Sequence, residues 1–421
     1  MNITLQRQGK VDAEVTAPPS KSYTHRALLT GSLGNGTTTL LNPLYAEDTL
    51  LTIQALRALG SAITEEPGRI IIQGNDGAFP TKETTFLDLD NSGTSLRLLA
   101  SVALLCRNAV ILTGSERMQE RPIGPLVSAL RSIGGSVDYV KKEGYPPVRV
   151  SGCLKGGSVV VDGTISSQFI SSVLLVAPYA ETGIELVIPS PPSSRSYLDI
   201  TLDVMQAFGA DFTREGYARF FVHNNRKYQG RTYAVEGDYS SASYFFALAA
   251  VCGGRVTVRN LNPDSVQGDR RFTEVLRSMG CTVTCSGNAV TVERTGDLCG
   301  ITVDMSSSPD TVQTLCMVAA MATTPTTITG ISHLKFKESD RITSTAERLR
   351  ALGGDVEVGH DRITIRPAPL RGAPVDPAND HRTAMSFAVL GMGIGGVTIT
   401  HAECVNKSFP GFWDILDGIH Q

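Results

Sequence analysis

The sequence lacks several features that would point to particular classes of protein. Its 8 cysteines form no CxxC pair and have no spacing with histidine that suits a metal ion, so we expect no metal site. The formal net charge is −3, which provides no general basic field for nucleic acid. Any binding of anions must therefore come from a local cluster of cations.

Long apolar runs are also absent. The most apolar stretch, 96–112, is interrupted by Arg107 and Asn108, so we expect no transmembrane helix. The first residues, MNITLQRQGK, lack the apolar core of a signal peptide. Cysteines that read as buried thiols suit a reducing compartment. These features predict a cytoplasmic protein that binds neither membranes nor nucleic acid.

What the sequence does contain is a repeat of about seventy residues. Short β-like runs begin at Gly36, Asn108, Gly183, Gly254, Thr326 and Gly396, with spacings of 72, 75, 71, 72 and 70 residues. A glycine that closes a helix recurs at Gly60, Gly134, Gly209, Gly280 and Gly353. Because a repeat puts equivalent loops in equivalent places, residues far apart in the sequence can meet in one site.

The fifth repeat shows the expected order of elements. Pro309-Asp310 opens a buried helix, TTITGI follows as a strand, and a second helix ends at Gly353. Alternating runs around Gly359-His360-Asp361 predict a hairpin. The repeat is therefore helix, strand, helix, hairpin. A solenoid is the alternative, but seventy residues is long for a solenoid unit and one helix is too apolar to face water.

The length and the repeat together predict two domains. A chain of 421 residues exceeds what one core usually supports, and six repeats divide into three per domain near 236–238. The last repeat lacks its hairpin, which two strand-like runs in the N-terminal segment could supply. We therefore expect an α/β protein with a discontinuous domain, about 1–19 plus 237–421, and an inserted domain, about 20–236.

One recurring position is the start of each apolar helix. These starts read Ser20-Lys21-Ser22, Asn91-Ser92-Gly93, Ser166-Ser167-Gln168, Asp238-Tyr239-Ser240, Pro309-Asp310 and Asp380-His381-Arg382. Helix N-termini bind anions through free N–H groups and the helix dipole, although plain N-capping explains any single start. Capping does not explain Lys21, Arg26, Arg97 and Arg382, because a cation there opposes the dipole unless an anion binds.

The second recurring position is the loop after each repeat strand. Five of the six loops carry cations, which are Arg117, Arg121, Arg195, Arg270, Arg271, Lys335, Lys337, Arg341 and Lys407. The first loop departs from this pattern with Glu47-Asp48. Ordinary solvated surface residues are the alternative for any one cation. Their recurrence in a weakly acidic protein favours a small polyanionic substrate.

Three acidic residues stand among these cations. Cations lower the pKa of a carboxyl group and burial raises it, so Asp310, Glu338 and Asp380 are candidates for proton transfer. For Asp380 we favour an N-cap, which is also an alternative for Asp310. Glu338 could instead simply pair with Lys337 or Arg341.

Eight motifs resemble a known family. They are PPSKSYTHRAL, NSGTSLR, ERPIGPLV, DGTISSQFISS, EGDYSSASY, FKESDRI, NDHRTAMSF and NKSFPGFWD, and they run from residue 18 to 414. They are similar to the enolpyruvyl transferases, and among these to the EPSP synthases. The resemblance implies a two-domain inside-out α/β barrel with three βαβαββ units per domain, related by pseudo-threefold symmetry. It also implies a double-strand hinge near 18–21 and 235–238, and a monomer.

The resemblance also implies a reaction. In that family, shikimate 3-phosphate and phosphoenolpyruvate give 5-enolpyruvylshikimate 3-phosphate and phosphate through a tetrahedral intermediate, as a step towards chorismate and the aromatic amino acids. No metal or other cofactor is implied, and glyphosate is the expected inhibitor. The two substrates carry phosphates and carboxylates, which is the kind of ligand that the recurring cations favour.

Matching motif positions carry over the roles of single residues. The resemblance implies that shikimate 3-phosphate is bound by Lys21, Ser22, Arg26, Ser166, Ser167, Gln168, Ser194, Tyr197, Asp310, His333 and Lys337. It implies that phosphoenolpyruvate is bound by Lys21, Asn91, Gly93, Arg121, Gln168, Arg341, Arg382 and Lys407. The implied catalytic residues are Asp310 for the 5-hydroxyl proton, Glu338 for the methylene proton, and Lys21.

One position departs from the family pattern, and two alternatives to this function stay open. His333 stands where several members have Asn, so its contact could depend on pH. The sister enzymes that use UDP-N-acetylglucosamine carry a Cys in the loop that here reads SERMQERP. A non-catalytic clamp or scaffold is the other alternative, and it would need neither Asp310 nor Glu338.

Overall fold

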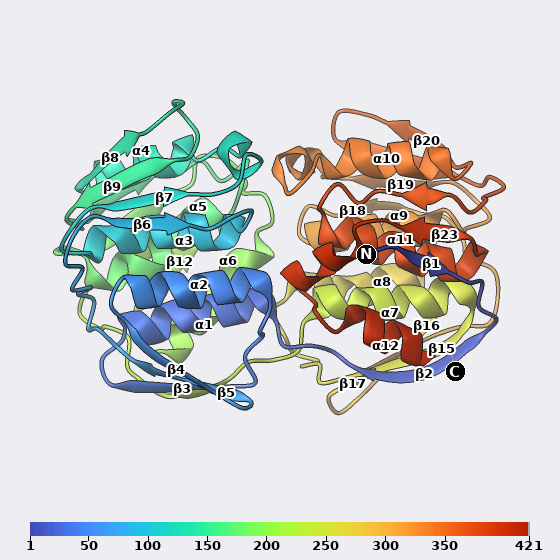
Figure 1. Cartoon of the computed structure of the whole chain (residues 1–421), viewed down its shortest axis with the longest axis horizontal. Coiled ribbons are helices and arrows are strands. Elements are labelled where there is room, and N and C mark those ends of the chain that lie inside the picture. Colours follow the sequence, from blue (N-terminus) through green and yellow to red (C-terminus); the bar gives the residue numbers. More distant parts are fainter. Residues whose placement is uncertain (420–421) are drawn as a thin grey trace. The chain divides into compact units, whose positions relative to one another are not determined.

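The computed structural model describes residues 1–419, which divide into two compact units. Unit 1 combines Met1–Pro18 with the chain from Glu236 onward, and unit 2 is Pro19–Val235. The chain therefore passes between the units twice, after Pro18 and after Val235. Figure 1 shows the N-terminal strands, in dark blue, among the yellow-to-red elements of unit 1. Each unit is described by itself below.

Unit 2 contains three four-stranded sheets of one design. Its strands are β3 Thr37–Leu41, β4 Ala62–Glu66, β5 Arg69–Gln73, β6 Thr85–Asp88, β7 Val110–Thr113, β8 Gly135–Tyr139, β9 Val148–Gly152, β10 Gly157–Val160, β11 Ile184–Val187, β12 Phe212–Glu215, β13 Arg219–Val222 and β14 Thr232–Ala234. The orders are β14-β3-β5-β4, β6-β7-β9-β8 and β10-β11-β13-β12. In each sheet the first pair is parallel and the other pairs are antiparallel.

Unit 1 repeats this design with one variation. Its strands are β1 Ile3–Leu5, β2 Val11–Thr16, β15 Gly254–Arg259, β16 Thr282–Ser286, β17 Ala289–Arg294, β18 Thr302–Asp304, β19 Thr326–Thr329, β20 Asp355–Val358, β21 Arg362–Arg366, β22 Pro374–Val375 and β23 Val397–Ile399. The orders are β2-β15-β17-β16, β18-β19-β21-β20 and β22-β23-β1. The third sheet has three strands because no hairpin follows β23 within residues 1–419.

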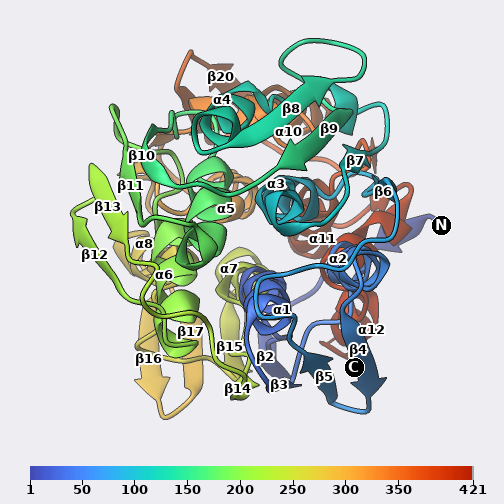
Figure 2. The same cartoon turned by 90° about the vertical axis from the view of Figure 1, so that its left-hand side faces the viewer.

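The helices form an inner and an outer set in each unit. The inner helices are α1 Lys21–Leu33, α3 Gly93–Val102, α5 Gln168–Val176, α7 Tyr239–Cys252, α9 Val312–Ala319 and α11 His381–Ile394. The outer helices are α2 Glu47–Ala58, α4 Gly124–Ser132, α6 Ser196–Ala207, α8 Phe272–Ser278, α10 Arg341–Ala351 and α12 Phe412–Ile419. The inner helices are buried over nearly their whole length, as their apolar sequences require. Figure 2 shows unit 2 with its helices inside and its sheets outside.

The fold class and the repeat predicted from the sequence are confirmed. Each repeat contains the predicted helix, strand, helix and hairpin, except in the last, and the glycines that close the helices have positive φ, such as 106° at Gly60 and 95° at Gly353. Reading the residues missed the short strand before five of the six inner helices; β14 and β18, for example, have only 3 residues each. The sheets are open, and no closed barrel occurs in residues 1–419.

The expectation for the N-terminal segment was partly wrong. Its two strands do not form one hairpin in the last sheet, since β1 pairs antiparallel with β23 but β2 pairs parallel with β15. The reason is the length of β2, because all six of its residues pair in register with the six residues of β15. Val11 and Val15 of β2 are buried in the same core as Val256 and Val258 of β15. The N-terminal segment thus joins two sheets of unit 1.

We predict that β1 contributes strongly to the stability of unit 1. Leu5 is buried beside Gly391, where an added Cβ would lie 2.9 Å from the Cβ of Leu5. Leu5→Ala should therefore cost about 2–5 kcal/mol. Urea unfolding followed by the fluorescence of Trp413, the one tryptophan of the sequence, reports on unit 1. The control Thr4→Ala removes an exposed hydroxyl and should cost less than about 1 kcal/mol; equal costs would contradict the prediction.

Candidate active site

The inner helices of unit 2 begin without side-chain caps. In the described structure, Ser20, Ser92 and Ser167 make no capping hydrogen bond to the helices that they precede. Plain capping is therefore the wrong explanation for Ser20, Ser92 and Ser167. Their first-turn N–H groups and the positive end of the dipole favour a negatively charged ligand.

Lys21, the first residue of α1, is held by a residue that sequence reasoning had set aside. Its Nζ lies 2.8 Å from Oδ2 of Asp48, and the Asp48 side chain is 3% exposed. Asp48 is the second residue of α2, where a carboxylate is favoured by the helix dipole. The Glu47-Asp48 departure from the cationic pattern was the signal for this pair. The acidic loop of the first repeat places a counter-charge beside the lysine of the first helix.

A chain of buried hydroxyl groups fixes the helices around Asp48. The Oγ atoms of Ser92 and Ser95 lie 2.7 Å apart, and Ser95 Oγ lies 2.8 Å from Thr52 Oγ1. Thr52 Oγ1 is 2.8 Å from His25 Nδ1, and Ser95 donates to the Asp48 carbonyl at 3.2 Å. These bonds connect α1, α2 and α3. These bonds therefore fix the positions of the N-terminal ends of α1 and α3 relative to each other.

Gly93 makes room for Arg121. The Arg121 Nη1 donates to the carbonyl of Asn91 at 3.1 Å and to its Oδ1 at 3.2 Å. A Cβ at position 93 would lie 2.6 Å from the Nη2 of Arg121, closer than such atoms approach. The structure thus brings together three predicted phosphoenolpyruvate residues at the start of α3.

Gln168, at the start of α5, lies beside the start of α3. Its Oε1 accepts from Arg97 Nη1 at 2.8 Å, and its Nε2 donates to Thr94 Oγ1 at 2.9 Å. Ser166 Oγ accepts from the Gln168 N–H at 3.3 Å. Arg97 also lies over the ring of Phe169. The N-termini of α3 and α5 are therefore linked through polar side chains.

Arg26 is placed differently from the other predicted cations. It is 1% exposed, and burial lowers its pKa to about 10. Its Nε donates to Thr201 Oγ1 at 2.7 Å, and Nη1 and Nη2 donate to the carbonyls of Ser22 and Tyr197. Arg26 thus connects α1 with α6. Ser194, two residues before α6, has a φ of 53°. The Arg26 guanidinium positions two predicted ligand residues.

Several cations of the recurring loops have local partners. Arg117 pairs with Glu120 at 3.2 Å, and Arg195 lies over the ring of Tyr217. Arg270 donates to the carbonyl of Pro263, and Arg271 donates to that of Asp304 at 3.0 Å. For these four residues the surface alternative fits the structure better than anion binding.

In unit 1, Arg341 contacts three carboxylates and is 2% exposed. Its Nη1 lies 2.9 Å from Asp310 Oδ1, its Nη2 2.8 Å from Glu338 Oε2, and its Nε 2.9 Å from Asp380 Oδ2. Burial opposes the charge of Arg341, but the three carboxylates outweigh burial and raise its pKa well above the usual value. These residues, together with Arg382, are called the carboxylate–arginine cluster below.

Arg382 completes the cluster from α11. Its Nη2 lies 2.7 Å from Asp310 Oδ2, and its Nη1 donates to the Asp310 carbonyl at 3.3 Å. Asp380 caps α11 by accepting from the Arg382 N–H at 3.0 Å, as the favoured interpretation predicted. Both carboxylate oxygens of Asp310 contact arginine, Oδ1 with Arg341 and Oδ2 with Arg382. Glu338 pairs with Arg341, which was one of its alternatives.

Other predicted residues of unit 1 lie in or next to short 3₁₀ helices. His333 lies in the 3₁₀ helix η6 (Ser332–Phe336), directly before Lys337 and Glu338, and Lys407 ends η7 (Ala402–Lys407). Burial, and then the nearby Lys337, lower the pKa of His333 to about 3. Its ring is therefore neutral near pH 7, and the expected pH dependence of its contact does not follow from this structure.

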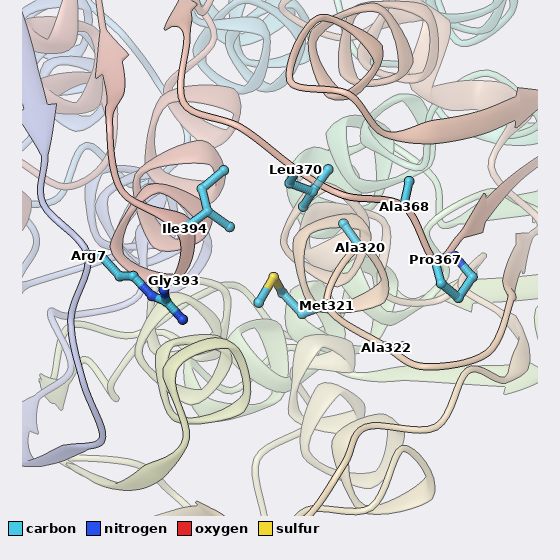
Figure 3. Close-up of a pocket in the computed structure, with 9 residues that line it drawn as sticks. All are labelled: Arg7, Ala320, Met321, Ala322, Pro367, Ala368, Leu370, Gly393 and Ile394. Atoms are coloured by element: carbon cyan, nitrogen blue, oxygen red, sulfur yellow. The ribbon is translucent and has the colours of Figure 1, made fainter.

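The cavity in Figure 3 lies away from these residues. It has a volume of about 340 Å³, and its lining includes Arg7, Met321, Leu370 and Ile394. Of the residues that line the cavity, Met321 lies just after the C-terminal end of α9, and Ile394 is the last residue of α11. The carboxylate–arginine cluster lies at the N-terminal ends of those helices. The described chain contains no group of three His, Cys, Asp or Glu side chains placed to hold a metal ion. Among residues 1–419, no helix has the length and hydropathy needed to span a membrane.

We predict that Arg341 is essential to the stability of unit 1. Arg341→Met leaves three carboxylates, two of them nearly or fully buried, without this partner and should cost about 3–5 kcal/mol. The control Arg350→Met, on the same helix, replaces an exposed residue that bonds the Val356 carbonyl and should cost about 1 kcal/mol. Urea unfolding followed by Trp413 fluorescence measures both. A cost for Arg341→Met no larger than that of the control would show the cluster to be dispensable.

Comparison with known proteins identifies the family. The family model for EPSP synthase (3-phosphoshikimate 1-carboxyvinyltransferase) matches residues 5–416. Proteins named 3-phosphoshikimate 1-carboxyvinyltransferase from Methanoregula boonei and Methanoculleus marisnigri are 62% and 59% identical, covering 100% and 99% of each chain. The solved EPSP synthase of Acinetobacter baumannii superposes with a TM-score of 0.82 at 29% identity, covering 99% of this chain and 98% of its own. The chain belongs to the EPSP synthase family.

Proposed function

We propose that this enzyme transfers the enolpyruvyl group of phosphoenolpyruvate to the 5-hydroxyl of shikimate 3-phosphate, as its relatives are named for doing. The observation that carries the mechanism is the contact of Asp310 and Glu338 with one buried arginine. Two carboxylates fixed by a shared cation can transfer protons at defined positions. The proposal uses no metal or other cofactor.

Unit 2 supports the binding of the phosphorylated groups. We assign shikimate 3-phosphate to the uncapped starts of α1 and α5, with Lys21, Ser22, Ser166, Ser167 and Gln168 as donors. Arg26 holds the backbone of Ser22 and of Tyr197 through its hydrogen bonds. The family resemblance adds Ser194 and Tyr197 to the residues proposed to bind shikimate 3-phosphate. The role of Arg26 is thus positioning through its neighbours.

Phosphoenolpyruvate is assigned to the start of α3 and to cations of unit 1. Arg121 lies over Gly93, so this glycine lets the guanidinium approach the backbone of α3. Arg341, Arg382 and Lys407 would supply further positive charge for the phosphate and carboxylate. We also propose that glyphosate competes for this site. The cytoplasmic location is an expectation from the cysteines and the N-terminal sequence, and the monomeric state is an expectation from the family resemblance.

The addition step needs one proton removed and one supplied. In this proposal Asp310 accepts the proton of the 5-hydroxyl as its oxygen attacks C2, and Glu338 serves the transfer of a proton to C3. In the elimination step the phosphate leaves C2 and C3 returns the proton. Lys21, held by Asp48, stabilises negative charge on the leaving phosphate. His333 and Lys337 would bond the ring hydroxyl region of shikimate 3-phosphate.

We predict specific binding of shikimate 3-phosphate, measured by titration calorimetry, and phosphate release after phosphoenolpyruvate is added. UDP-N-acetylglucosamine should not bind, because the SERMQERP loop has no Cys and the serines at the start of α5 suit a phosphate on the sugar-like ring. Absence of shikimate 3-phosphate binding would refute the proposed function. Binding of both substrates without phosphate release would indicate a scaffold.

We predict that the two carboxylates matter for turnover more than for binding. Asp310→Asn and Glu338→Gln should each lower kcat by about a hundredfold or more, with a much smaller change in the dissociation constant of shikimate 3-phosphate. The control is Asp340→Asn, because Asp340 caps α10 and bonds Thr343 instead of Arg341. Near-normal kcat in both test variants would remove them from the proton transfers.

A further inference from the structure

Asp269 is a buried carboxylate that the proposed mechanism does not use. It lies in the 3₁₀ helix η4 (Gly268–Arg271) and is 5% exposed. One of its oxygens accepts a hydrogen bond from Ser240 Oγ. Its other oxygen, Oδ1, has no hydrogen-bond partner among residues 1–419. An ionised carboxylate with an unbonded buried oxygen is costly, so this site favours a neutral acid.

The inner helix α7 places Asp269 beside the carboxylate–arginine cluster. Ser240 and Tyr244 are four residues apart, so they lie on one face of α7. Ser240 bonds Asp269, while the Tyr244 hydroxyl accepts from Arg382 Nη1 at 3.4 Å. The partner of Asp269 and a partner of Arg382 are therefore one helical turn apart.

A second contact joins the segment that carries Asp269 to the segment that carries Asp310. The Oγ of Ser308, which precedes η5 (Pro309–Thr311), donates to the carbonyl of Gly268 at 2.7 Å. Gly268 is adjacent to Asp269, and Asp310 is two residues after Ser308. The segment with the proposed base and the segment with the unused acid are thus tied together directly.

The charge balance of the cluster means that the ionisation of Asp269 affects Arg382. Two arginines already face the three carboxylates of Asp310, Glu338 and Asp380. A fourth carboxylate beside Arg382 would neutralise more of the positive charge of Arg382, whereas a neutral acid would not. We propose that Asp269 is a positioning residue whose ionisation sets how strongly Arg382 attracts the anionic substrate. This inference rests on the proposed function for the assignment of phosphoenolpyruvate to Arg382.

The surrounding charges determine the pH range of the effect. Burial, and then Asp310 of η5, raise the pKa of Asp269 to about 7. Arg382 of α11 and the Ser240 hydrogen bond oppose this rise, and Asp238 at the start of α7 adds to it. The charged residues of α8, Glu274 and Arg277, are exposed, and Arg270 of η4 donates to Pro263. Asp269 is therefore neutral below about pH 7 and ionised above it.

The test is the pH dependence of phosphoenolpyruvate binding. Calorimetry with phosphoenolpyruvate alone needs no turnover, and it compares the wild type with Asp269→Asn between about pH 6 and about pH 8, either side of the pKa of about 7. The ligand's own ionisation is the same for both proteins. Relative to Asp269→Asn, the wild type should lose roughly tenfold in affinity across this range. Asp264→Asn, which removes an exposed carboxylate from the preceding loop, should follow the wild type.

A second variant keeps the test decisive if Asp269→Asn folds poorly. Ser240→Ala removes a hydrogen bond that lowers the pKa of Asp269, so the loss of affinity should move to higher pH. The infrared C=O absorption of a protonated carboxyl group should titrate near pH 7 in the wild type and be missing in Asp269→Asn. The same pH course of binding in the wild type and Asp269→Asn would overturn the inference, as would a missing infrared band. Failure of the wild type to bind phosphoenolpyruvate would instead refute the proposed function.

Discussion

The arrangement of unit 1 depends on one buried guanidinium. Arg341 contacts Asp310, Glu338 and Asp380, which come from three different segments. Each carboxylate would be costly to bury alone, and each is stabilised by the same planar group. The start of α10, the 3₁₀ turn before α9 and the start of α11 therefore meet at one point. The proposed acid and base owe their placement to this contact.

The two units differ in how the N–H groups at the starts of their inner helices are bonded. In unit 2, Ser20, Ser92 and Ser167, directly before α1, α3 and α5, accept no capping hydrogen bond from the helix that each precedes. In unit 1, Asp238 and Asp380 cap α7 and α11. A capped end no longer offers its bonded N–H groups to a ligand. Unit 2 is thus suited to bind anions through its backbone, and unit 1 through arginine side chains positioned by carboxylates.

The sequence predicted the architecture better than the contacts. Periodicity indicated the repeat, since glycine positions and apolar helices are local properties. Asp48 was visible as a departure from the cationic loops, but its bond to Lys21 depends on how α2 packs on α1. Similarly, no pattern distinguishes Asp310, which bonds two arginines, from Asp380, which bonds an arginine and also caps its helix. Arg26 and Asp269 could not be interpreted without knowing that both are buried. The role of His333 changed for the same reason, because burial keeps its ring neutral.

The N-terminal strands also determine the order in which the protein can fold. Unit 2 is one continuous segment, so all its strand partners are present once residue 235 has been synthesised. Strand β2 must wait for β15, and β1 must wait for β23, near the other end of the chain. Contacts between such distant segments form slowly. On the ribosome, unit 2 therefore folds first. Strand β1 stays without its partner strand until the chain is almost finished.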